Sequence, residues 1–333
     1  MKKIKIIPFV LIIIFIISSC SNVFGNSIQE NNIEEGIMVE VQIREGESLA
    51  EIADLLEEKG VVESGFVFRL YVQQKGKEKE LLPGKYNLET GSEMEDVLNI
   101  ISSGPKIITY KFAIPEGSIV EQVKAKIVEK LPFIDYAEVN NALSVSNYGY
   151  PFLQDIESLE GFLFPKTYEV TAKYEAKDII EMMLSQYQLE TSALDYSFAQ
   201  ENDLSSYDIL KIASLIEREA YIPEERELIS AVIHNRLDIG MPLGIDATVR
   251  YALAKWDEDL TKSDLEYDSK YNTRIYPGLP PTPICNPGVA SIKAALNPAD
   301  VDYLYFVVTD EEKHTHSFSN TLEEHEQLTN NQN

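Results

Sequence analysis

The sequence predicts an α+β protein in which short strands alternate with amphipathic helices. In the first half, segments 41–58, 86–101 and 112–130 each combine a short strand pattern, a glycine turn and apolar residues at helical spacing. Near the C-terminus, residues 303–309 are mainly β-branched and aromatic and predict a further, buried strand. A chain of 333 residues is long enough for two domains with separate cores.

The N-terminus has the pattern of an export signal or a membrane anchor. Three lysines among the first five residues precede an apolar run, residues 6–17, which is shorter than the roughly 20 residues of a membrane-spanning helix. Ile17–Cys20 also resembles the lipobox of bacterial lipoproteins, in which the cysteine is lipidated. We expect residues 1–25 to attach the chain to the cytoplasmic membrane, by one span or through Cys20, with the remainder outside the cytoplasm. A removable secretory signal is the alternative, and residues 26–38 are expected to form a linker.

Acidic residues outnumber basic ones, 55 against 29, and the formal charge is −26. This charge excludes nucleic acid as an expected partner, because binding nucleic acid needs a basic face. Cys20 and Cys285 are too few for a disulfide framework. His314 and His316 are close enough to raise the question of a zinc site, but their spacing suits a strand. We expect neither a metal nor a cofactor.

Serines precede the three helices predicted in the first half and are expected to act as N-caps, at Ser48, Ser92 and Ser118. The first strand-turn-helix unit resembles a LysM-like module, a small fold that in many proteins binds N-acetylglucosamine chains. We therefore assign residues 39–105 to a LysM-like α+β subdomain. A spacer that lifts the C-terminal domain off the membrane is an equally good interpretation of this region.

The loop Glu160–Tyr168 contains many large apolar side chains for a segment with glycine and proline. Two interpretations are open, because the loop could pack into the core or its aromatic residues could form the wall of a sugar-binding cleft. The polar tail after His325 is expected to fray, with residues 329–333 disordered. Further helices are predicted from apolar spacing and capping residues at 136–143, 176–189, 223–240 and 291–296.

Two glutamates, Glu217 and Glu219, lie near the end of a helix with a regular apolar stripe. The stripe is formed by Ile209, Ile212, Ala213, Ile216 and Ala220. The two glutamates fall on its opposite shoulders. A carboxyl group beside a buried stripe is a candidate general acid, because burial favours its protonated form. On periodicity alone, ordinary boundary carboxylates are the simpler explanation.

Ten short motifs follow one another within residues 160–325. They are Glu160–Pro165, Ala213–Glu219, Val232–Leu237, Asp246–Tyr251, Tyr271–Thr273, Gly278–Pro281, Asn286–Gly288, Ala294–Pro298, Tyr303–Val307 and His316–Ser319. In this order they resemble the endolytic murein transglycosylases, the MltG or YceG-like family.

The resemblance implies a membrane-anchored lyase that cuts nascent peptidoglycan strands between N-acetylmuramic acid and N-acetylglucosamine, and so ends glycan elongation. The cut is non-hydrolytic, because the muramic acid 6-hydroxyl attacks its own C1 and leaves a 1,6-anhydro end. The catalytic glutamate of the family corresponds to Glu217, which would act first as acid and then as base. Residues 106–328 would form the YceG-like catalytic domain. No second catalytic carboxylate and no metal are needed.

The resemblance also suggests tentative substrate-binding roles for Glu160, Glu219, Asp246, Tyr271 and Asn272. Each of these residues could instead support the fold or hold a turn. The implied partners are peptidoglycan glycan strands, the cytoplasmic membrane and cell-wall synthases such as penicillin-binding proteins. The chain departs from the family pattern at Gly244, Ala247, Thr282, His314 and Glu326.

Two other functions are compatible with the same sequence. A non-catalytic peptidoglycan-binding or scaffold protein would have no need of a carboxylic acid at Glu217. A lysozyme-like hydrolase would use the acid but leave reducing ends instead of anhydro ends. Replacement of Glu217 by glutamine is expected to keep the fold and abolish cleavage.

Overall fold

The computed structural model describes residues 35–256, 258–310, 312–313 and 315–330. Two compact units make up the chain, the first ending at Ile107 and the second beginning at Ile108. The anchor predicted over residues 1–25 lies outside the described residues, as does most of the predicted linker. Within the described ranges, no helix combines the length and the apolar character needed to cross a bilayer.

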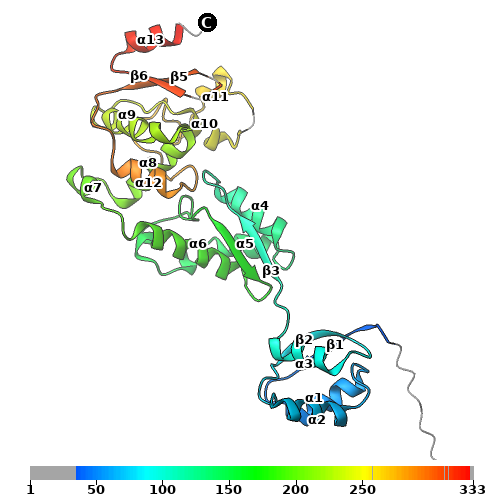
Figure 1. Ribbon diagram of the computed structural model, residues 1–333. Helices are drawn as coiled ribbons and strands as arrows, with labels where there is room; N and C mark the ends of the chain where they lie inside the picture. Colours follow the sequence, from blue (N-terminus) through cyan, green and yellow to red (C-terminus); the bar gives the residue numbers. More distant parts are fainter. Residues whose placement is uncertain (1–34, 257, 311, 314, 331–333) are drawn as a thin grey trace, which may run out of the picture. The chain divides into compact units, whose positions relative to one another are not determined.

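The first unit packs helices against a small antiparallel sheet (Figure 1). Its elements are β1 (Met38–Ile43), α1 (Leu49–Glu58), α2 (Gly65–Lys75), β2 (Gly84–Glu89) and α3 (Met94–Ser103). Val41 of β1 pairs with Tyr86 of β2, and both side chains point into the core. This core is filled from the helices by residues such as Leu56, Phe68 and Ile101.

Only one of the three predicted serine caps is present. Ser48 caps α1 as predicted and forms a capping box. The predictions for Ser92 and Ser118 are wrong, because the N-cap is in each case the next residue. Their hydroxyl groups donate instead to carbonyl oxygens of the preceding turn, those of Glu89 and Pro115. A hydroxyl that bonds backward in this way is not available to the helix.

The second unit begins with a strand pair and its covering helices. In chain order these are β3 (Thr109–Ala113), α4 (Val120–Lys130), α5 (Tyr136–Ala142), β4 (Thr167–Thr171) and α6 (Ala176–Thr191), with two 3₁₀ turns at Val145–Asn147 and Pro151–Leu153. β3 and β4 run antiparallel with Phe112 opposite Tyr168. The aromatic loop precedes β4, and Phe162, Leu163 and Phe164 are at most 6% exposed. The core-packing interpretation of this loop is therefore correct, and an aromatic wall built by these side chains is wrong.

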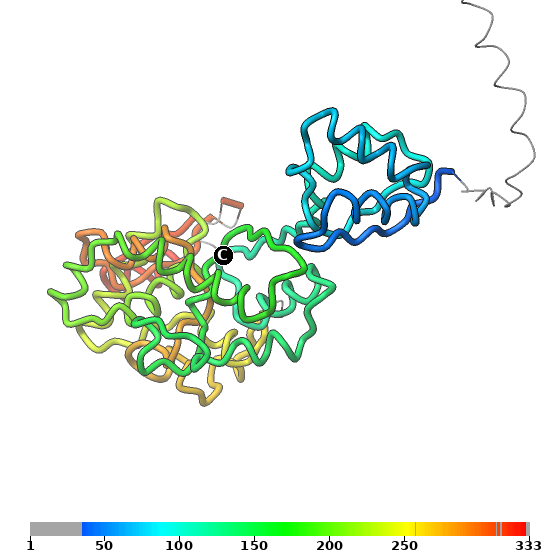
Figure 2. The backbone as a smooth tube through the Cα atoms, turned by 90° about the horizontal axis from the view of Figure 1, so that it is seen from below, coloured from blue at the N-terminus to red at the C-terminus, as the bar shows by residue number. Residues whose placement is uncertain are grey.

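The rest of the second unit carries the remaining family motifs. Its elements are α7 (Ser197–Glu201), α8 (Ser206–Glu219), a 3₁₀ turn (Pro223–Glu225), α9 (Arg226–Asp238), α10 (Asp246–Leu253), α11 (Lys262–Leu265), α12 (Val289–Leu296), β5 (Tyr305–Asp310), β6 (Thr315–Ser319) and α13 (Leu322–Asn330). α8 and α12 pack together although far apart in sequence, as the green and orange segments show (Figures 1 and 2). β5 is only partly buried, and α13 continues through residues expected to fray.

Candidate functional site

The helix predicted to carry the two glutamates is α8, and its apolar stripe is buried as expected. Ser205 caps the helix through a capping box with Asp208. The stripe from Ile209 to Ile216 is fully enclosed in the core, and Ala220 ends the helix at 9% exposure. Glu217 is partly buried on one shoulder of this stripe. The helix is thus held rigidly by packing, and Glu217 projects from its last turn.

Two hydrogen-bond donors hold the carboxyl group of Glu217. The backbone N–H of Gly288 lies 3.0 Å from Oε2, and the Ser291 hydroxyl donates to the same oxygen over 2.7 Å. Gly288 is the N-cap of α12, so a helix N-terminus faces the carboxyl group. Both bonds from the described residues end on Oε2, which leaves Oε1 as the oxygen that can exchange a proton with a ligand.

The proline-rich segment 277–287, which precedes α12, is hydrogen-bonded to α8 and so positions Gly288 and Ser291 beside Glu217. The backbone N–H of Ile284 donates to Ser214 Oγ over 3.0 Å, and the Cys285 thiol contacts the Ser214 carbonyl oxygen. Cys285 is completely buried. The segment therefore reaches Gly288 in a defined register relative to Glu217.

Asn286 joins three parts of the unit at this place and is completely buried. Its Oδ1 accepts the N–H of Leu163 at 2.8 Å, and its Nδ2 donates to the Ser118 carbonyl oxygen at 2.8 Å. A further contact, 3.4 Å long, joins Nδ2 to Oε1 of Glu160. The aromatic loop, the turn before α4 and the segment before α12 are thereby fixed to one another.

Glu160, predicted as a sugar ligand, is only 3% exposed. Its carboxylate oxygens accept the backbone N–H of Val120, at the start of α4, and the hydroxyl of Tyr251 at 3.1 Å. Burial raises the pKa of Glu160 to about 7, although these hydrogen bonds oppose the shift. The contacts give this carboxyl a role in holding the fold around the site, and its role in binding sugar stays a prediction.

Two other predicted ligands are also engaged in loop structure. Asn272 is completely buried, and its amide donates to the carbonyl oxygens of Leu265 and Tyr267. The Tyr271 hydroxyl lies 2.9 Å from Thr282 Oγ1, at one of the departures from the family pattern. Tyr271 is partly exposed and remains able to contact a ligand.

Glu219 and Asp246 are brought together on the other shoulder of α8. Both line a cavity of about 560 Å³ together with Arg274, Tyr305 and other residues. Asp246 forms a 2.7 Å ion pair with Arg274. Burial raises the pKa of Glu219 to about 7, with a smaller contribution from the charge of Asp246. Glu217 and Glu219, which lie two positions apart on α8, thus face different surroundings.

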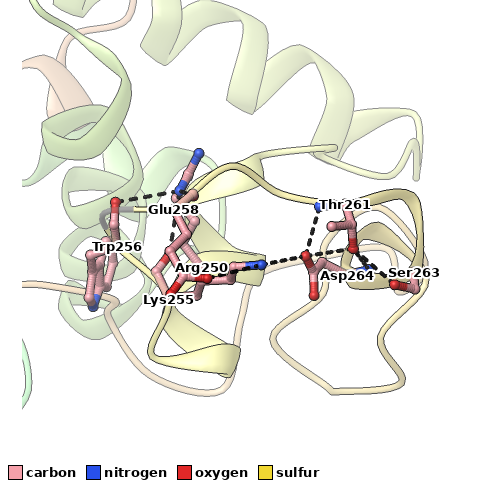
Figure 3. Close-up of polar contacts among 7 residues, drawn as sticks. All are labelled: Arg250, Lys255, Trp256, Glu258, Thr261, Ser263 and Asp264. Atoms are coloured by element: carbon pink, nitrogen blue, oxygen red, sulfur yellow. Dashed lines mark hydrogen bonds and ion pairs between the residues drawn. The ribbon is translucent and has the colours of Figure 1, made fainter.

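Arg218, between the two glutamates, is held by Trp256. Its guanidinium lies 4.2 Å from the centre of the Trp256 ring and donates to the Gly117 carbonyl oxygen at 3.3 Å. The loop that carries Trp256 is itself fixed by Arg250, which donates to the carbonyl oxygens of Lys255, Trp256 and Glu258 (Figure 3). The ion pair between Lys255 and Asp264, 2.9 Å long, braces the same loop (Figure 3).

The model of the YceG-like family matches residues 41–331. The chain belongs to the YceG-like family. An endolytic murein transglycosylase of Bacillus subtilis is 32% identical over 86% of this chain and 82% of its own length. A relative of the same name from Streptococcus pneumoniae strain R6 is 31% identical over 86% of this chain, which spans 57% of that protein.

A crystal structure agrees with the family assignment. The putative yceG-like protein from Listeria monocytogenes shares 32% identity with this chain and superimposes with a TM-score of 0.59. The match covers 87% of this chain and 98% of the Listeria chain. The α+β fold described above is therefore a YceG-like fold.

The sequence predicts a catalytic role for Glu217 but gives no sign of the donors that hold its carboxyl group. Gly288 belongs to the family motif Asn286–Gly288, but a single sequence does not show that its N–H contacts Glu217, 71 positions earlier. Ser291, inside a predicted short helix, carried no signal of its own. Among the described residues, no group of three or more histidine, cysteine, aspartate or glutamate side chains is arranged to hold a metal ion.

Proposed function

We propose that this YceG-like protein is a lyase, an endolytic transglycosylase that cleaves the bond between N-acetylmuramic acid and N-acetylglucosamine in peptidoglycan strands. Relatives about 30% identical over most of the chain carry the name endolytic murein transglycosylase. The observation that carries the proposal is the arrangement at Glu217. Its Oε2 is held by two donors, and its Oε1 is left to exchange a proton.

A single carboxyl group is sufficient for this reaction. The protonated Oε1 of Glu217 would give its proton to the glycosidic oxygen as the bond to C1 breaks. The resulting carboxylate would then take the proton of the muramic acid 6-hydroxyl as that oxygen attacks C1. The electron pair of the cleaved bond leaves with the N-acetylglucosamine oxygen, and the protonated carboxyl group is regenerated. The nucleophile belongs to the substrate.

The proposal is tested by analysing the ends of the products. Uncrosslinked glycan strands are incubated with the purified extracytoplasmic part of the chain, and the products are separated and weighed by mass spectrometry. A lytic transglycosylase produces anhydro ends, each lighter by one water than the product of hydrolysis. Reducing ends would identify a hydrolase, and intact strands would support the non-catalytic scaffold. Either result would overturn the proposal.

We further propose that the first unit is LysM-like and contributes to glycan binding. The order strand, helix, helix, strand from β1 to β2, with the strands paired antiparallel, supports this interpretation. Binding of residues 35–107 to chitin oligosaccharides, measured by calorimetry, tests it. If no heat of binding is measured at millimolar oligosaccharide, the glycan-binding proposal is refuted and the spacer interpretation is favoured.

We also propose that the N-terminal segment attaches the protein to the membrane, with the second unit on the extracytoplasmic side. The lysines followed by an apolar run and Cys20 support the proposal. Fractionation of cells that express the full chain or a Cys20→Ala variant separates the alternatives. Release of only the variant indicates a lipid anchor, retention of both indicates a spanning segment, and release of both refutes attachment. Recruitment of a cell-wall synthase is a separate expectation, tested by crosslinking.

A further inference from the structure

A second carboxyl group, that of Glu116, lies against the residue that holds Glu217. A Cβ atom built on Gly288 would collide with Oε1 of Glu116. Gly288 has φ −74° and ψ 165°, a conformation that any residue can adopt. The Glu116 carboxyl group therefore occupies the space next to Gly288, and a side chain at position 288 would have to displace it. Glu116 and Glu217 both contact Gly288, one through its Cα side and the other through its N–H.

The turn that carries Glu116 is tied into the centre by backbone hydrogen bonds. The N–H of Gly117 donates to the carbonyl oxygen of Asn286 at 3.0 Å, and the N–H of Asn286 donates to that of Ser118 at 2.8 Å. Arg218, which follows Glu217 in the chain, also donates a hydrogen bond to the Gly117 carbonyl oxygen. These bonds come from α8 and from the segment before α12, so they hold the backbone of the turn that carries Glu116 next to Gly288 and Glu217.

Glu116 is also accessible from solvent. It lines a hollow of about 300 Å³ together with Gln122, Lys126 and Arg218. The charged groups around its carboxyl group are Glu217 and Arg218 from α8, Arg226 from α9 and Lys126 from α4. Partial burial raises the pKa of Glu116, the charge of Glu217 raises it further, and Arg226 opposes the shift.

We propose that Glu116 is a positioning residue for the acid–base chemistry of Glu217, acting through the repulsion between the two carboxyl groups that both contact Gly288. This inference rests on the proposed function, because it assigns a partner to the proposed acid. Two negative charges around Gly288 repel each other, so the doubly ionised pair is disfavoured. Since Oε2 of Glu217 accepts the Gly288 N–H and the Ser291 hydroxyl, Oε1 is the oxygen of Glu217 on which this repulsion would favour a proton.

The first test is the pH profile of cleavage by a Glu116→Gln variant. Removing the charge of Glu116 removes a repulsion that would favour the protonated form of the proposed acid. The alkaline limb of kcat/KM should therefore move down by at least about half a pH unit. Glu224→Gln, which removes an exposed carboxylate from the turn between α8 and α9, is the charge-matched control and should leave the profile unchanged. An unmoved limb in Glu116→Gln would overturn the proposal, because a merely structural residue would change the rate without moving the limb.

The second test does not depend on cleavage. Urea unfolding is measured for the wild type, Glu116→Gln, Glu217→Gln and the double variant at pH 7.5 and pH 4. At pH 7.5, Glu116→Gln should raise the urea midpoint more in the wild type than in the Glu217→Gln background, and this difference should vanish at pH 4. Equal changes in both backgrounds at pH 7.5 would show that the carboxyl groups do not interact.

Together the two measurements separate this inference from the proposed function. If the wild type cleaves no glycan but the urea measurements show an interaction between Glu116 and Glu217, the transglycosylase proposal is refuted and the interaction between the two carboxyl groups is supported. Anhydro products without any coupling would support the enzyme and overturn the role of Glu116.

Discussion

Ser291 donates its hydroxyl proton to Oε2 of Glu217 over 2.7 Å, across a sequence separation of 74 residues. The bond joins α12 to the last turn of α8, and Gly288 supplies a second donor to the same oxygen. An oxygen that accepts two donors is poorly placed to carry a proton. The geometry therefore distinguishes the two oxygens of one carboxyl group, and this distinction can be tested by substitution.

Glu217→Gln should reduce cleavage to a trace and preserve the fold. The amide oxygen can accept the bonds from Gly288 and Ser291, whereas the amide nitrogen cannot serve as an acid. Loss of general acid–base catalysis should lower the rate by about 10²- to 10⁴-fold. Release of soluble anhydro products measures the rate, and a thermal melt checks the fold. Turnover near the wild-type level with unchanged melting would contradict the assignment of Glu217.

Ser291→Ala should reduce cleavage without abolishing it. The variant removes one hydrogen bond to a carboxylate, while the Gly288 N–H still holds Oε2. We expect a loss of about tenfold in kcat, since such a bond contributes roughly 1.5 kcal/mol. Steady-state kinetics on glycan strands measures the effect.

Ser230 provides the matched control for Ser291. It is equally buried, and within the described part of the chain its Oγ has no hydrogen-bond partner. Ser230→Ala should therefore leave kcat unchanged. Similar losses in the two variants would mean that the Ser291 effect comes from packing.

Glu160 should make folding stability depend on pH. Its pKa is raised from 4.5 to about 7, so the folded chain holds a proton that the unfolded chain releases between these values. The free energy of unfolding should consequently fall as the pH rises from about 4.5 to 7, by up to about 3 kcal/mol from this group. Glu160→Gln should flatten that part of the curve, as measured by urea unfolding at pH 5 and pH 8.

The contribution of Glu160 is isolated by comparison with Glu157. Glu157→Gln removes an exposed carboxylate three residues earlier and should retain the wild-type pH dependence. Glu219 adds a slope of the same sign, which is common to all these chains. A Glu160→Gln curve parallel to the wild type would refute the prediction.

Gly161→Ala should destabilise the second unit strongly. Gly161 has φ +92°, and a Cβ there would lie 2.6 Å from Cγ of Pro283, whose ring cannot move aside easily. Strain and overpacking together should cost about 2–4 kcal/mol. Gly278 has φ +89° but open space around it, so Gly278→Ala should lose only about 1 kcal/mol. Equal losses in the two variants, measured by urea unfolding, would show that the contact with Pro283 is unimportant.

The helix that carries Glu217 was predictable because its apolar pattern is local in sequence. The stripe from Ile209 to Ala220 repeats at helical spacing, and the structure buries it as expected. The aromatic loop was ambiguous because burial and ligand binding favour the same side chains. Only the three-dimensional packing of Phe162 and Leu163 decides between them.

The surroundings of Glu217 could not be predicted from one sequence. Gly288, Ser291 and Glu116 reach it through contacts that span 70 or more residues, and periodicity carries no information about such contacts. The family motifs pointed to the segment around Asn286 without saying what it touches. The serine caps at Ser92 and Ser118 failed for a related reason, since a nearby carbonyl oxygen competed for the hydroxyl.

The way in which α8 and α12 meet has a consequence for biosynthesis. A nascent chain that has been made only as far as α8 already contains Glu217, but it lacks the two donors that orient the carboxyl group. Premature termination or proteolytic loss of the residues after 287 would remove both hydrogen-bond donors to the Glu217 carboxyl group. A polypeptide that ends before Gly288 would thus contain the proposed acid without the two donors that orient it, and such a fragment should not cleave glycan strands.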